Sequence, residues 1–89
     1  DGEWEESKSY ATVGTTVKVS GTITSPDGTW NIKVSSSQGW KKEYDSVPTG
    51  QSESFSIKTN FGSTKVTIKI WSVNGAADEG LQGQFKVDY

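Results

Sequence analysis

The chain has 89 residues, and its nine basic and eleven acidic side chains give a formal net charge of −2, so it is one small domain without a strong electrostatic preference. It contains no Cys, His or Arg. Disulfides, a Cys and His zinc site and a bidentate guanidinium clamp for anions are therefore excluded. The small acidic excess and the lack of Arg also argue against nucleic acid as a partner.

The composition favours β-structure throughout residues 1–89, which we expect to form a single domain. Ser and Thr are abundant, Val and Ile supply most of the aliphatic side chains, and the chain has one Leu and no Met. Such a composition suits half-solvated strands and disfavours helices. An aromatic content of 11% with a small net charge indicates a folded chain rather than a disordered one. No apolar run approaches the ~20 residues of a membrane helix, so we do not expect a membrane-embedded protein.

The N-terminal part of the chain predicts a terminal segment and two strands. Residues 1–8 begin with an acidic stretch and are expected to fray. A short strand over residues 9–13 follows, and residues 15–24 alternate as a second strand. In that second strand Gly21 takes an inward position, where we expect a bulky neighbour, a Trp, to fill the space. The other inward positions are Val17, Val19 and Ile23.

The middle of the chain predicts three more strands. The turn sequence Ser-Pro-Asp-Gly at residues 25–28 leads into a strand over residues 29–36. Residues 40–47 form a weaker strand whose charged side chains suit a sheet edge. Residues 53–60 form the fifth strand. The inward side chains of the third and fifth strands are Trp30, Ile32, Val34, Phe55, Ile57 and Thr59.

The strand over residues 64–73 is the best specified. Val66, Ile68 and Ile70 alternate with two lysines and a threonine, and the opposite orientation would bury unpaired ammonium groups. Trp71 falls on the lysine side, away from the core. After a loop over residues 74–80, residues 81–89 form the seventh strand.

Seven short strands with turn signals about every 8 to 12 residues predict an all-β, antiparallel two-sheet sandwich of immunoglobulin or fibronectin type. The segment SFSIKTNFGSTKVTIKIWSVNG at residues 54–75 resembles the E strand, E–F turn and F strand of a fibronectin type III domain. Trp30-x-Ile32-x-Val34 is similar to the C strand of that family, and bacterial immunoglobulin-like modules share the sandwich. The resemblance implies that the strands over residues 29–36, 64–73 and 81–89 lie in one sheet. It does not by itself specify a function.

We expect no enzymatic activity, no catalytic residues and no cofactor. His and Cys, the commonest general base and the thiol nucleophile, are absent. Glu43 and Asp45 are two residues apart on one strand face, about 6.6 to 7 Å, which suits a pair of glycosidase carboxylates, but a surface strand offers no cleft. Asn74, Asp78 and Glu79 carry oxygen ligands for calcium but are too few for a site, so no metal is expected.

Trp71 marks the candidate binding surface. With the strand pairing that the resemblance implies, amide and ammonium groups surround its indole on a flat face that lacks acids apart from Asp88. An indole stacks on the C–H face of a sugar while such donors meet its hydroxyls, so we expect a polysaccharide or cell-wall glycan, with an anionic polymer also attracted. In the alternative, Trp71 packs under the N-terminal segment and the lysines only keep the face soluble. The predicted ligand-binding residues are Asn31, Lys33, Thr67, Lys69, Trp71, Gln82, Gln84 and Lys86.

Two classes of function stay open. One is a non-catalytic extracellular or surface module that binds a glycan or spaces other domains. The other is a free-standing small secreted effector, antibacterial or inhibitor-like, that acts on a protein partner through loop residues Asn74, Gly75, Asp78 and Glu79. The chain begins with Asp1 rather than Met, and its disulfide-free, Ser/Thr/Gly-rich composition suits a processed protein that is secreted or on the cell surface. We expect it to be a monomer.

Overall fold

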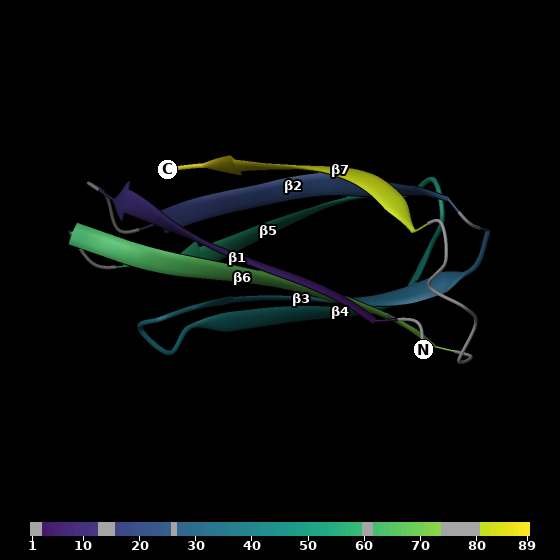
Figure 1. The fold of residues 1–89 in the computed structure, drawn as a ribbon, viewed down its shortest axis with the longest axis horizontal. Coiled ribbons are helices and arrows are strands. Elements are labelled where there is room, and N and C mark those ends of the chain that lie inside the picture. The colour runs from purple at the N-terminus through teal and green to yellow at the C-terminus, as the bar shows by residue number, and fades with distance from the viewer. Residues whose placement is uncertain (1–2, 13–15, 26, 60–61, 74–80) are drawn as a thin grey trace.

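A computed structural model describes residues 3–12, 16–25, 27–59, 62–73 and 81–89, and every regular element in these ranges is a β-strand (Figure 1). The predicted seven-stranded antiparallel sandwich of two sheets is confirmed. The strands are β1 (Glu3–Thr12), β2 (Thr16–Ser25), β3 (Thr29–Ser36), β4 (Lys41–Pro48), β5 (Ser52–Lys58), β6 (Gly62–Ser72) and β7 (Gln82–Asp88).

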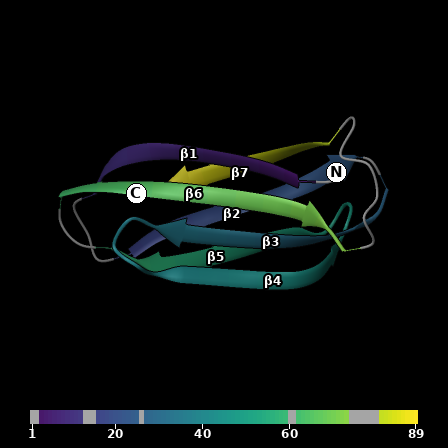
Figure 2. The same cartoon turned by 60° about the horizontal axis from the view of Figure 1, so that its bottom comes forward.

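The strands divide into a four-stranded sheet with the order β1-β6-β3-β4 and a three-stranded sheet with the order β5-β2-β7. Figure 2 shows the two sheets packed face to face, with β1 and β7 at one side of the sandwich and β4 and β5 at the other. The edge strands β1 and β7 meet where the rings of Tyr10 and Tyr89 lie 4.7 Å apart, centroid to centroid.

The strand boundaries lie close to the predicted ones except at the N-terminus. β3 has the predicted limits, whereas β1 begins at Glu3, within the segment that we expected to fray. It pairs with β6 over its whole length, from Glu3 opposite Trp71 to Thr12 opposite Gly62. The sequence does not reveal this strand, because charged side chains lie on both of its sides. Glu5 is on the outer side, and Glu6 and Lys8 are on the inner side with Trp4 and Tyr10.

The core lies between the sheets, and the buried apolar residues in the described ranges are aliphatic apart from Trp30 and Phe55. Trp30 is fully buried, and its indole Nε1 donates a hydrogen bond of 3.0 Å to Thr49 Oγ1, so its polar atom is satisfied inside the protein. The predicted inward side chains of the second, third, fifth and sixth strands are all buried. The buried apolar residues are Val17, Val19, Ile23, Trp30, Ile32, Val34, Val47, Phe55, Ile57, Val66, Ile68 and Ile70.

The strand order differs from the one that the family resemblance implies. In an immunoglobulin sandwich the first strand belongs to the sheet of the second and fifth strands, and the last strand joins the third and sixth. Here these two positions are exchanged, since β1 lies beside β6 and β7 lies beside β2. The expectation that the third, sixth and seventh strands share a sheet is therefore wrong.

The inner faces of β2 and β7 explain this pairing. Gly21 lies directly opposite Phe85, and a Cβ on Gly21 would overlap both the ring of Phe85 and the carbonyl oxygen of Gln84. Phe85, and not the Trp that we expected, fills the space that the glycine leaves. An aromatic ring that covers a glycine on the neighbouring strand specifies both the partner and the register of β7.

We expect Gly21→Ala to destabilise the fold because the added methyl group meets backbone as well as a ring. Overpacking of this kind costs about 1 to 3 kcal/mol, which lowers the Tm of a domain this small by roughly 5 to 20 °C in a thermal melt. Gly28→Ala is the matched control, since a Cβ there would come no closer than 3.6 Å to Trp30. Equal melting temperatures for the two variants would contradict the close contact between Gly21 and Phe85.

Candidate functional site

The outer face of the four-stranded sheet carries Trp71 at the end of β6. Trp71 is half-buried, whereas its neighbour Ile70 is buried and points to the core. Trp4 and Tyr10 of β1 pair with Ile70 and Thr64, both buried, so they lie on the inner side of the sheet. The described part of β1 thus lies beside Trp71 in the sheet, and its two aromatic rings do not cover the indole.

Strand β3 brings predicted site residues next to those of β6. Asn31 lies directly opposite Trp71, and Lys33 directly opposite Lys69. Side chains at such positions have Cβ atoms about 4.5 to 5.5 Å apart. Thr67 lies on the same face of β6, two residues before Lys69, so five of the eight predicted ligand-binding residues form one continuous patch. We call these residues the Trp71 face: Asn31, Lys33, Thr67, Lys69 and Trp71.

Two contacts orient the polar groups of this patch. The Lys69 Nζ lies 5.6 Å from the centroid of the Trp71 ring, within range of a cation–π interaction. The backbone N–H of Ser46 donates a hydrogen bond of 3.2 Å to Asn31 Oδ1. Because the amide oxygen is held in this way, the NH2 group is the end of Asn31 that can donate to a ligand.

The other three predicted residues lie on the opposite side of the molecule. Gln82, Gln84 and Lys86 belong to β7 and face Ser25, Thr22 and Ser20 on the outer face of the three-stranded sheet. Lys86 forms an ion pair of 3.5 Å with Asp88 there. The predicted site is therefore divided, because it depended on a β6–β7 pairing that does not occur.

Strand β1 occupies the place that we expected for β7, and it changes the charge of the face. Glu5 lies opposite Lys69, and on the far side Glu43 of β4 lies opposite Lys33. A row of Glu5, Lys69, Lys33 and Glu43 thus crosses the sheet with no net charge. The expectation of a face without acids apart from Asp88 is therefore wrong. The attraction of an anionic polymer to this face stays a prediction. The two glutamates offset the repulsion between lysines on adjacent strands.

The next outward pair along β1 and β6, after Glu5 and Lys69, consists of two hydroxyl side chains. Ser7 of β1 lies opposite Thr67, and their hydroxyl oxygens are 2.8 Å apart. The face is thus covered by an indole, an amide, ammonium and carboxylate groups and hydroxyls, each at the spacing of neighbouring strands.

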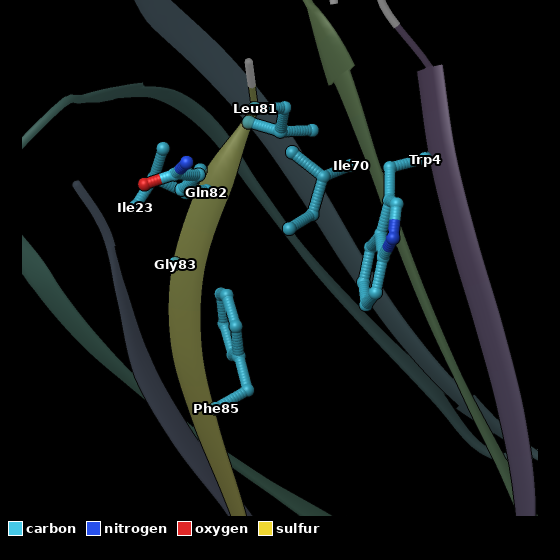
Figure 3. Close-up of a pocket in the computed structure, with 7 residues that line it drawn as sticks. All are labelled: Trp4, Ile23, Ile70, Leu81, Gln82, Gly83 and Phe85. Carbon is cyan, nitrogen blue, oxygen red and sulfur yellow. The ribbon is translucent and has the colours of Figure 1, made fainter. Parts of the chain in front are cut away.

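A second feature, which we did not expect from the sequence, is an apolar pocket between the edge strands β1 and β7. It has a volume of about 360 Å³, and in Figure 3 Trp4 of β1 stands across it from the β7 side chains, with Ile70 behind. Trp4 is 36% exposed at this opening. We missed the pocket because we expected Trp4 to lie in a frayed terminus. Trp4 and Tyr10 lie an even number of positions apart in the sequence, and this spacing is the signal that would have placed both on the inner side of one strand. The lining residues are Trp4, Ile23, Ile70, Leu81, Gln82, Gly83 and Phe85.

The remaining expectations concern other parts of the chain. The predicted loop site of Asn74, Gly75, Asp78 and Glu79 lies outside the described residues. Trp40 precedes β4 and is 44% exposed, with the Lys58 Nζ 5.4 Å from its ring centroid.

In the described ranges, His, Cys, Asp and Glu side chains form no group of three or more that would hold a metal ion. The same ranges contain no helix with the length and apolar character needed to cross a membrane.

No protein-family model matches the chain, and neither the curated proteins nor the solved structures contain a significant match to it. We therefore infer function from the geometry of the protein itself.

Trp71 and Trp30 are expected to differ sharply in their contribution to stability. Trp30→Ala empties a fully buried site and costs about 3 to 5 kcal/mol, whereas Trp71→Ala removes a half-buried ring and costs about 2 kcal/mol. Urea denaturation of the two variants measures both free energies of unfolding. A loss of several kcal/mol for Trp71→Ala would place this side chain in the core and remove it as a ligand platform.

Proposed function

We propose that the protein is a non-catalytic binding module, secreted or on the cell surface, that takes a polysaccharide such as a cell-wall glycan on the Trp71 face. The observation that supports this most directly is the cross-strand placement of Asn31 opposite Trp71 and of Lys33 opposite Lys69. An aromatic plane and three hydrogen-bond donors are thereby neighbours on a regular sheet, so their backbone positions are already set before a ligand binds.

The chemistry of a saccharide fits these groups. The indole presents an apolar plane to the C–H face of a sugar ring, while Asn31 Nδ2 and the ammonium groups of Lys33 and Lys69 donate to its hydroxyls. The Glu5 carboxylate, across from Lys69, accepts hydrogen bonds from other hydroxyls. Because Glu5 and Glu43 balance Lys69 and Lys33 next to the indole, we expect an uncharged glycan rather than a polyanion at this part of the face. Lys41 and Lys65 lie further along the same outer face.

Two observations favour a binding role over catalysis. The sequence lacks His and Cys, and both carboxylates of the row, Glu5 and Glu43, are exposed on the sheet surface rather than enclosed with a partner acid. A glycosidase needs two carboxyl groups that flank a bound sugar and differ in environment. A module that only spaces other domains is the competing proposal, and it requires no ligand on this face.

The proposal is tested by titration of the protein with soluble neutral oligosaccharides of several linkages, followed by tryptophan fluorescence and calorimetry. We expect binding by at least one of them, abolished by Trp71→Ala and weakened about two- to tenfold by Asn31→Ala, which removes one neutral hydrogen bond. Trp40→Ala is the matched control, since Trp40 is exposed elsewhere and its loss should leave the affinity unchanged.

Equal loss of binding in the Trp40 and Trp71 variants would contradict a site on the Trp71 face. Absence of binding across a broad glycan array would favour the spacer role instead.

A further inference from the structure

Strand β1 is the longest regular sheet edge in the described part of the chain. Its ten residues contain no Pro or Gly and pair with β6 without a shift in register. The other edges are protected in familiar ways. β4 contains Pro48 and a register shift beside Ser46, whose φ is 58°. β5 and β7 have seven residues each, and the ladder of β7 with β2 is also interrupted.

The sequence of β1 is complementary to itself. In an antiparallel pair of two β1 strands with a twofold axis at Ser7, residue numbers that face each other sum to 14. Glu6 then faces Lys8 of the second copy, and Trp4 faces Tyr10 of the second copy. All four side chains lie on the inner side of the sheet, since they pair with residues 64, 66, 68 and 70 of β6. Each copy thus offers an opposite charge and an aromatic ring to the other.

Neighbouring registers lack this complementarity. Two residues that face each other across the pair must lie on the same side of the sheet. The twofold axis must therefore pass through a residue of β1, not between two residues, and the nearest alternatives to Ser7 are Glu6 and Lys8. An axis at Glu6 would place Glu6 against itself, and an axis at Lys8 would place Lys8 against itself. Like charges directly opposite each other destabilise a strand pair. Of these three axes only the one at Ser7 avoids such a pair. An axis at Ser9 also avoids it, but it places Lys8 opposite Tyr10 and Glu6 opposite Thr12 and so leaves both charges without an opposite charge.

We propose that two copies of the chain associate by pairing their β1 edges about Ser7, which joins the two four-stranded sheets into one of eight strands. The occupant of the edge is thus a second copy of the same chain. An uncharged strand that added to this edge would remove Glu6 and Lys8 from water without supplying an opposite charge, which is unfavourable. A second copy supplies the partner for each, so the same two side chains select self-association.

The open side of the sandwich is consistent with this arrangement. The seam between β1 and β7 is closed at one end by the Tyr10–Tyr89 contact, and at the other it opens into the pocket beside Trp4 (Figure 3). Glu6 and Lys8, between these two points, are exposed although they belong to the inner side of β1. In the dimer, Tyr10 of the second copy lies opposite Trp4 and therefore beside the mouth of the pocket.

Sedimentation equilibrium over a concentration series at low ionic strength tests the proposal. An edge-to-edge contact is small, so we expect a weak dimer with a dissociation constant in the micromolar to millimolar range. Glu6→Lys alone or Lys8→Glu alone places like charges at two symmetric contacts and should weaken association at least about tenfold. Circular dichroism establishes that each variant is folded.

Restoration of the charge pairs gives the decisive comparison. The double variant Glu6→Lys/Lys8→Glu should dimerise like the original chain. An equimolar mixture of the two single variants should do the same, because both contacts of the mixed dimer join opposite charges. Glu43→Lys and Lys18→Glu make the same charge changes away from β1 and serve as controls that leave association unchanged.

A chain that stays monomeric up to millimolar concentration would overturn the proposal. So would single variants that associate as strongly as the original, or a mixture that shows no restoration. None of these outcomes depends on whether the Trp71 face binds a glycan.

Discussion

The contact of Phe85 with the backbone of Gly21 determines how the two sheets are composed. It holds β7 beside β2, in the three-stranded sheet. The edge of β6 is then available to β1, which pairs with it along ten residues. The carboxylate and hydroxyl groups on one side of the Trp71 face follow from this choice, because the strand next to β6 brings Glu5 and Ser7 instead of the amides of Gln82 and Gln84. A glycine on the inner side of one sheet thus influences which groups reach the outer face of the other sheet.

The two sides of β1 have separate roles. Its outward residues Glu5 and Ser7 complete the Trp71 face, where they meet Lys69 and Thr67. Its inward residues line the seam with β7, and only Trp4 and Tyr10 of them are aromatic. A strand with this alternation contributes little apolar area to the core, and its position depends mainly on the hydrogen-bonded ladder with β6. A strand that contributes little to the core is therefore the one that both candidate surfaces share.

The sequence was sufficient to predict what local alternation encodes. The strands around Trp30, Phe55 and Ile68, the inward direction of those side chains and the outward direction of Trp71 all follow from a period of two. The order of the strands does not, because alternation states which way a side chain points and not which strand it meets. Asn31, Lys33 and Lys69 were grouped correctly since β3 and β6 do pair, whereas Lys86 was misplaced with β7. Glu5 was missed because β1 carries charges on both of its sides.

Pairing of two β1 edges would have a consequence for valency. The outer faces of the two copies would become one continuous surface, and strand spacing and rise place their two indoles about 30 Å apart. A long polymer that bound at one Trp71 would reach the other as an intramolecular event, at an effective concentration far above that of a second free chain. Short oligosaccharides could not span this distance. The dimer would therefore bind long polymers more tightly than short oligosaccharides, a preference that a single Trp71 face would not have.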